Sequence, residues 1–153
     1  MRFGVFYELQ LPKPWDDGAE QRLVDEAIEQ VVLADSLGIE HAWAVEHHFL
    51  DEYSHCSASD VFLTALAAKT ENIRVGFGIR QVIPHYNPPA RTAETVGMLD
   101  LVSHGRVEFG IGESATRMEL RGFNISAKKK RDLALEAAEQ IATETESTPP
   151  EKP

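Results

Sequence analysis

Short apolar runs alternate with amphipathic segments along the chain, and this alternation limits the possible folds more than any other feature of the sequence. The runs are rich in β-branched and aromatic residues, so we expect strands at residues 2–8, 39–45, 73–79 and 106–111. The amphipathic segments have helical spacing and cover residues 19–37, 57–69, 89–102 and 127–142. Strands that alternate with helices predict an α/β fold with a parallel sheet and right-handed crossovers. The alternation leaves open whether the sheet is open or part of a barrel.

The alternation ends near residue 142, which suggests one folded unit over residues 1–142. The chain has 153 residues, an ordinary length for a single domain. Residues 143–153 are mostly acids, threonines and prolines. Such a segment cannot bury enough apolar surface to order itself, so we expect residues 143–153 to form a disordered tail.

The composition argues against some partners. The net charge of −10 argues against nucleic acid, because binding to phosphates requires a basic face. No apolar run approaches the length of a membrane span, and the N-terminus lacks the pattern of a signal peptide. Cys56 is the one cysteine, so no internal disulfide forms, which suits a reducing cytoplasm. We therefore expect a cytoplasmic protein with no membrane or nucleic-acid partner.

The segment Glu46-His47-His48-Phe49 is the main candidate for a functional site. It follows the apolar run Ala42–Val45, and ligands bind at the carboxyl ends of parallel strands. Side chains alternate along a strand, so the two histidines should face different surroundings. One is expected to line a pocket, while the other packs under a helix or bonds to Glu46. Either His47 or His48 could act as a general base or an electrostatic stabiliser.

The segment has two other interpretations. A metal site would draw on nearby side chains of the right type, namely Glu46, His47, His48, Asp51, His55 and Cys56. Neither a His-Glu-x-x-His helix nor a paired-cysteine spacing is present, so we expect no metal. In the simplest interpretation, the histidines only cap the end of the sheet and titrate in water.

Two further segments resemble phosphate-binding motifs. Residues 110–115 fit a loose G-x-G-x-x-A pattern, but they follow the fourth strand, and Glu113 would repel a pyrophosphate. Tight turning is the preferred role of Gly110 and Gly112. The basic run Lys128–Arg131 could hold a phosphate, and a solvated turn is the preferred interpretation.

Taken together, residues 1–125 resemble the bacterial luciferase-like flavin monooxygenase family. The resemblance is carried by motifs that occur in the same order as in that family. They are Arg2–Phe6, Ala42–Phe49, Ile73–Gly78, Asn87–Glu94, Leu99–Gly112 and Arg121–Phe123. It implies a TIM (β/α)8 barrel that uses reduced FMN and oxygen to oxygenate a small organic substrate. The reduced flavin often comes from a partner NAD(P)H-dependent reductase. A minority of relatives use a deazaflavin and reduce their substrates instead.

The resemblance also assigns roles to particular residues. His47 corresponds to the catalytic histidine that lies beside the flavin and assists its reaction with oxygen. The end of the third strand packs on the isoalloxazine ring, often through a strained peptide, and this segment corresponds to Phe77, Gly78, Ile79 and Arg80. The position that helps to hold the flavin phosphate corresponds to Glu113 and the adjacent Ser114. Some relatives have arginine where this chain has Glu113.

The length of the chain departs from the family pattern. A (β/α)8 barrel takes about 250 residues, whereas the alternation here supplies only four β/α units, or half of a barrel. Four parallel strands cannot close, so their inner face would expose apolar side chains. We therefore expect a homo-oligomer, such as a dimer, that completes the core. The alternative function is a non-catalytic half-barrel module for assembly or binding that has lost its flavin.

Overall fold

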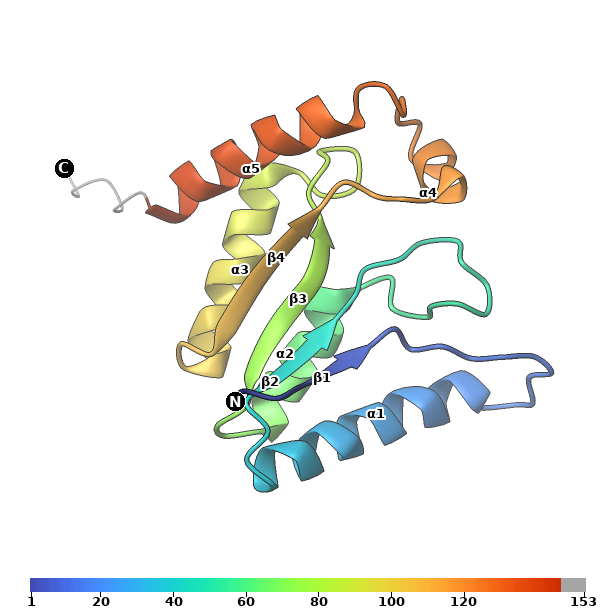
Figure 1. Ribbon diagram of the computed structural model, residues 1–153, viewed down its shortest axis with the longest axis vertical. Helices are drawn as coiled ribbons and strands as arrows, with labels where there is room; N and C mark the ends of the chain where they lie inside the picture. The colour runs from blue at the N-terminus through green and yellow to red at the C-terminus, as the bar shows by residue number, and fades with distance from the viewer. Residues whose placement is uncertain (147–153) are drawn as a thin grey trace.

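Four strands pair side by side in the order in which they occur along the chain. The computed structural model describes residues 1–146 (Figure 1). The strands are β1 (Gly4–Tyr7), β2 (His41–Ala44), β3 (Arg74–Gln81) and β4 (Val107–Gly112). Every neighbouring pair is parallel, and the sheet order is β1-β2-β3-β4. The predicted α/β fold with parallel β/α units is confirmed.

The helices that connect the strands cover one face of this sheet. They are α1 (Ala19–Ser36), α2 (Ser59–Lys69) and α3 (Pro89–Ser103). The chain continues after β4 into α4 (Arg117–Gly122) and α5 (Lys130–Glu146), and α5 crosses α3 (Figure 1). None of the helices among residues 1–146 is long and apolar enough to cross a membrane.

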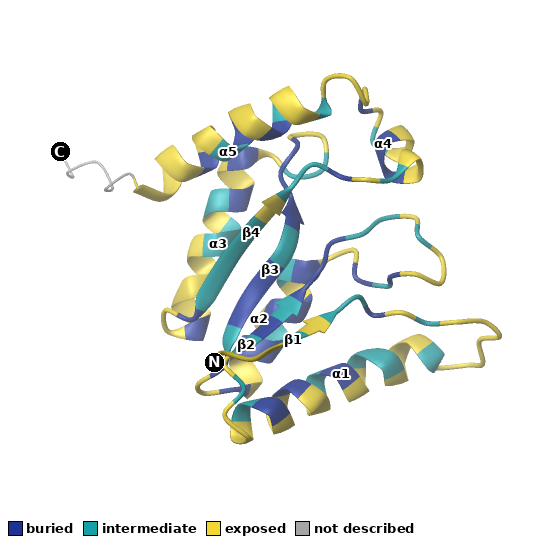
Figure 2. Cartoon of the chain, in the orientation of Figure 1, coloured by how far each residue is buried: buried dark blue, intermediate teal, exposed yellow. Residues whose placement is uncertain are grey.

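Alternation along the strands divides their side chains between a helix-covered face and an open face. Val75 and Phe77 of β3 are fully buried under the helices, together with Ala42 and Ala44 of β2. Burial is deepest along β3 and is lower in the edge strands β4 and β1 (Figure 2). Residues of opposite parity form the open face, which we call the inner face.

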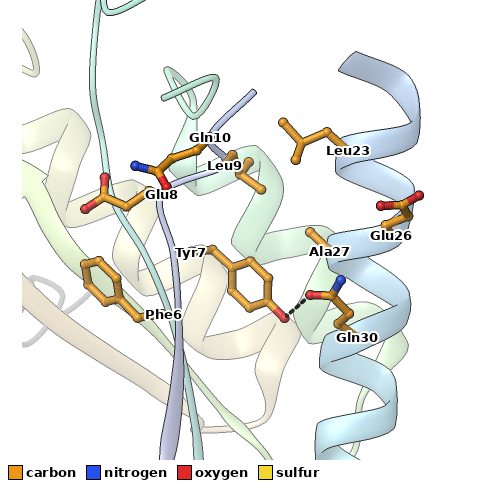
Figure 3. A pocket seen from close by; sticks show the side chains of 9 residues that line it. All are labelled: Phe6, Tyr7, Glu8, Leu9, Gln10, Leu23, Glu26, Ala27 and Gln30. Atoms are coloured by element: carbon orange, nitrogen blue, oxygen red, sulfur yellow. Dashed lines mark hydrogen bonds between the residues drawn. The ribbon is translucent and has the colours of Figure 1, made fainter. Parts of the chain in front are cut away.

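The inner face has large side chains beside glycines. Phe6 is 57% exposed there. Phe6 and Glu8 point away from α1, whereas Tyr7 points toward α1 and donates a hydrogen bond to Gln30 over 3.2 Å (Figure 3). The Trp43 ring occupies the space that a side chain at Gly76 would fill. The absence of a side chain at Gly76 therefore lets Trp43 lie against the sheet.

Two polar clamps join the helices to the amino-terminal end of the sheet. Asp35, near the end of α1, accepts the backbone N–H groups of Glu71, Asn72 and Ile73 at 2.7–3.0 Å. Arg106 is buried and donates to carbonyl oxygens at the ends of α2 and α3 and at the start of β3. Both clamps satisfy backbone groups that the turns leave unpaired.

Some predicted boundaries were wrong. The sequence interpretation missed α4, which Thr116 caps by accepting the N–H of Glu119. The fourth predicted helix, 127–142, instead begins at Lys130 and extends to Glu146, so the predicted boundary at 142 is too early. Helix-compatible residues continue past Ala142, and the hydroxyls of Thr143 and Thr145 bond to carbonyls of their own helix. The rest of the predicted tail, 147–153, lies outside the described residues.

Candidate functional site

The segment after β2 carries its histidines across the carboxyl end of the sheet. The N–H of Val45 donates to the carbonyl of Tyr7, and the N–H of His47 donates to that of Cys56. These bonds fix the backbone on both sides of Glu46. As predicted, the two imidazoles diverge, because His47 faces Glu8 and Glu119 whereas His48 faces Glu46.

His47 lies between two carboxylates that come from opposite ends of the described chain. Its Nδ1 is 2.9 Å from Oε1 of Glu119, and its Nε2 is 3.7 Å from Oε2 of Glu8. The Tyr53 ring meets the imidazole edge-on, with the ring centroids 5.3 Å apart. A carboxylate oxygen therefore faces each ring nitrogen, within hydrogen-bond distance at Nδ1 and as a longer ion-pair contact at Nε2.

Glu119 is fully buried and accepts hydrogen bonds on both of its oxygens. Oε1 accepts the backbone N–H of His48 at 3.0 Å, and Oε2 accepts the hydroxyls of Ser114 and Thr116 at 2.8 and 2.7 Å. Burial by itself would raise the pKa of Glu119, but hydrogen bonds from Thr116, His47, His48 and Ser114 hold the pKa below its ordinary value. Glu119 is therefore a buried carboxylate whose charge is stabilised by its hydrogen-bond donors.

Glu8 and Glu119 were not among the predicted site residues. The sequence does carry a signal for Glu119, because Thr116-x-x-Glu119 has the spacing of a capping box at a helix start. That signal predicts a helix end and not a contact with His47. No local pattern marks Glu8, whose role depends on the pairing of β1 with β2.

A pocket of about 540 Å³ opens beside His47. It is lined by residues of the segment after β2, together with Glu20 of α1 and Met118 of α4. On its wall, Nδ1 of His55 is 2.6 Å from Oε1 of Glu20. The pocket is large enough for a small organic molecule and has both apolar and ionisable walls.

His48 belongs to a second buried network, centred on Glu46. Glu46 is 2% exposed, and its Oε1 lies 3.1 Å from Nε2 of His48 and accepts Nδ2–H of Asn87 at 2.8 Å. Its Oε2 accepts the N–H of Gln81 at 3.1 Å and lies 3.5 Å from Nε of Arg80. The His48 ring stacks on Tyr86 with the centroids 5.6 Å apart. This network anchors the end of β3 and gives His48 a packing role.

The predicted flavin residues at the end of β3 do not all face the same way. Phe77 is fully buried on the helix-covered face, edge-on to Phe109, so its side chain points away from the inner face. Gly78 and Ile79 lie on the inner face, where they contact Trp43 and Gly112 respectively. The peptide bond between Gly78 and Ile79 is cis, and the register with β4 shifts there. The resemblance predicted an unusual peptide in this segment.

The residues predicted to hold the flavin phosphate are already engaged with other groups. The hydroxyl of Ser114 is buried and donates to Glu119. Glu113 pairs with Lys130 at 3.4 Å, and the same ammonium donates to the carbonyl of Ser114 at 2.7 Å. Lys130 is one cation of the basic run 128–131, which thus turns back toward β4. Within residues 1–146, no three His, Cys, Asp or Glu side chains converge as a metal site.

Comparison with known proteins identifies the relatives of this chain. Residues 1–150 match the family described as luciferase-like monooxygenase. The oxygenase component of the flavin-dependent trigonelline monooxygenase of Acinetobacter baylyi is 32% identical over 78% of this chain and 32% of its own length. The crystal structure of monooxygenase RslO1 from Streptomyces bottropensis is 30% identical, with a TM-score of 0.82 over 92% of this chain and 42% of that one.

A third comparison supports the fold. The oxygenating constituent of 3,6-diketocamphane monooxygenase from Pseudomonas putida, solved in complex with FMN, is 24% identical with a TM-score of 0.82. The alignment covers 92% of this chain and 38% of that one. The chain spans about a third of the length of the curated relatives it matches. Its four β/α units therefore correspond to half of a TIM barrel, and the chain belongs to the luciferase-like monooxygenase family.

Proposed function

We propose that this chain forms the His47-bearing half of a flavin-dependent monooxygenase that acts on a small organic substrate. The observation that carries the proposal is the position of His47 at the carboxyl end of the sheet, between Glu8 and Glu119 and beside a pocket. In parallel α/β folds this end of the sheet is where catalytic residues gather. His47 would hold or transfer a proton at Nε2 while the substrate reacts.

The inner face offers a surface that fits the flat ring of a flavin. Phe6, Trp43 and Ile79 line it, and a side chain at Gly78 would lie 3.2 Å from both Phe6 and Trp43. The absence of a side chain at Gly78 therefore leaves room for a planar ring to lie against the centre of this surface. When bound, reduced flavin supplies the electrons that activate oxygen. We propose that Gly78 and Ile79 contact the ring.

The flavin phosphate fits this chain less well. Lys130, which donates to the carbonyl of Ser114, is already paired with Glu113, so the phosphate would have to compete with a carboxylate. The backbone of Glu113 and Ser114 can still border the phosphate, but we propose that its main charge partner comes from a second chain.

That second chain is proposed to be another copy of this half-barrel. Both β1 and β4 are edge strands, and the exposed Phe6 lies on the face that a complete barrel would enclose. Unpaired edges and exposed apolar faces favour association, because pairing satisfies the edge backbone and removes apolar surface from water. A homodimer would therefore complete the core.

The cofactor and setting are proposed from the family. We propose FMN, reduced by a partner NAD(P)H-dependent reductase, with a deazaflavin as the alternative, and a cytoplasmic location. In the competing hypothesis, the chain is a non-catalytic assembly module. It is favoured by the engaged state of Ser114 and Glu113, which leaves no free phosphate ligand at those positions.

Flavin titration separates these functions. The fluorescence of FMN should change on binding to the wild-type chain, and the amount of oxygenated product formed from a small organic test substrate with reduced FMN should fall by about 100-fold in His47→Ala. His104→Asn is the matched control, because it removes an imidazole at the opposite end of the sheet, where φ is 56° and asparagine is tolerated. Absence of binding to either FMN or a deazaflavin, with a stable oligomer, would favour the assembly module.

A further inference from the structure

We propose that Glu119 is the positioning residue of this site, because its carboxylate accepts a hydrogen bond from Nδ1–H of His47 and so directs Nε2 toward Glu8. This inference rests on the proposed function in one respect, because it assumes that His47 takes part in the reaction. The hydrogen-bond geometry on which it stands is independent of any flavin.

The first step of the argument is the chemistry of the contact. An ionised carboxylate can only accept hydrogen bonds, so the 2.9 Å contact between Oε1 of Glu119 and the ring requires a proton on Nδ1 of His47. The other three donors to Glu119 are the hydroxyls of Ser114 and Thr116 and the N–H of His48. These donors fix both oxygens of the carboxylate, so the imidazole is held in one orientation.

The second step is what Nε2 then faces. Oε2 of Glu8 lies 3.7 Å away, is buried, and has no hydrogen-bond partner among the described residues. The other oxygen of Glu8 accepts the hydroxyl of Tyr53 at 3.3 Å. The 3.7 Å separation is an ion-pair contact and not a hydrogen bond, so a proton added at Nε2 would make His47 an imidazolium that faces the carboxylate of Glu8. Nε2 is therefore the nitrogen placed to exchange a proton.

The third step excludes a purely structural role in capping α4. The cap is formed by the hydroxyl of Thr116 and the backbone N–H of Glu119, and neither group requires a carboxylate at position 119. A capping role would therefore make Thr116 the important side chain. A positioning role makes the Glu119 carboxylate important and Thr116 secondary.

The test is NMR spectroscopy of the full chain with ¹⁵N-labelled histidine. Long-range ¹H–¹⁵N correlations show which ring nitrogen carries a proton, and the His47 signals are assigned by their loss in His47→Gln. The wild-type chain should show a protonated Nδ1 at His47. Glu119→Ala should lose this signature. Thr116→Ala removes the cap and one donor but leaves Ser114 and His48 to hold the carboxylate, so it should retain the signature.

The NMR result tests the role of Glu119, and flavin binding separately tests the proposed function. A wild-type His47 with an unprotonated Nδ1 would overturn it, even if Glu119→Ala fails to fold. The same signature in folded Glu119→Ala would also overturn it. If FMN binds, the amount of oxygenated product formed from a small organic test substrate should fall at least about tenfold in Glu119→Ala and change less than about twofold in Thr116→Ala. If no flavin binds, the proposed function fails while the tautomer measurement still stands.

Discussion

The indole ring of Trp43 occupies the space that a side chain at position 76 would require. These two residues are direct partners in the β2–β3 register, so the ring of one strand lies over the bare backbone of the next. The contact makes the inner face sensitive to a single methyl group.

Gly76→Ala is expected to lower the free energy of unfolding by about 1–3 kcal/mol, because the new Cβ would overlap the Trp43 ring. Urea unfolding followed by tryptophan fluorescence measures the change. Gly97→Ala is the control, since its added Cβ meets no atom within 4 Å and alanine is the better helix former. An equal loss of unfolding free energy in Gly76→Ala and Gly97→Ala would contradict the expected overlap with the Trp43 ring.

Arg106→Lys should destabilise the fold by about 3 kcal/mol, because lysine cannot reproduce the set of hydrogen bonds and leaves buried carbonyls unpaired. The comparison variant is Arg91→Lys, whose exposed pair with Glu94 should contribute less than about 0.5 kcal/mol. Denaturant unfolding at neutral pH measures the loss of unfolding free energy in each variant. Similar midpoints for Arg106→Lys and Arg91→Lys would show that the hydrogen bonds of Arg106 do not stabilise the fold as proposed.

Acid should destabilise the chain partly through Glu119 and Asp35. The pKa of each carboxyl is below its unfolded value, so each stabilises the fold above the unfolded pKa of about 4, and this stability is lost as pH falls through the folded pKa. For Asp35, burial by itself would raise the pKa, but the hydrogen bonds from the N–H groups of Glu71, Ile73 and Asn72 lower the pKa by more than burial raises it. The unfolding free energy of Glu119→Gln and Asp35→Asn should therefore vary less between pH 5 and pH 3 than that of the wild type. Parallel pH profiles for all three proteins would contradict this.

The Cys56 thiol should be unreactive in the folded chain. Burial, together with the charges of Glu46, Asp60 and Glu8, raises the pKa of Cys56 to about 12. A thiol reagent at pH 8 should label it only after urea is added, because the thiolate is the nucleophile. Because the pKa of Cys56 is higher in the folded chain than in the unfolded chain, the protonated thiol favours the fold below the unfolded pKa of about 8.5. This contribution to the free energy of unfolding is lost as pH rises above about 8.5 toward the folded pKa. Rapid labelling without urea would show that Cys56 is not buried in solution.

Phe6→Glu should weaken self-association if the inner faces of two copies pair. The side chain is 57% exposed in a single chain, so its replacement should leave the protomer folded. Leu135→Glu on α5 is the control, with a similar exposure of 56%. Sedimentation at micromolar concentration should show a shift toward monomer for Phe6→Glu alone. A monodisperse wild-type monomer would contradict the proposed dimer.

The sequence predicted the fold well because periodicity is a local property. Each strand and connecting helix was found near its predicted position, since apolar spacing reports directly which face of an element is buried. The missed α4 is a single short helix whose capping residue, Thr116, has no apolar periodicity around it. The error at Ala142 arose because composition was weighed above helical propensity.

The site was less predictable because its contacts join distant parts of the chain. His47 could be chosen from its place after a strand, but its partners Glu8 and Glu119 are brought to it by sheet pairing and by α4. The resemblance identified a segment and not the directions of its side chains, and alternation along β3 places the side chain of Phe77 under the helices. Ser114 was close to the site but is engaged with Glu119 and not free.

The two unpaired edges of the sheet determine how copies can join. In a ring of two related by a twofold rotation, β4 of each copy would lie beside β1 of the other, and the backbone groups of the four-residue β1 would find partners along the six-residue β4. An arrangement that joins one seam but misses the other leaves an end that recruits a further copy, so it grows into fibres instead of stopping at a defined particle.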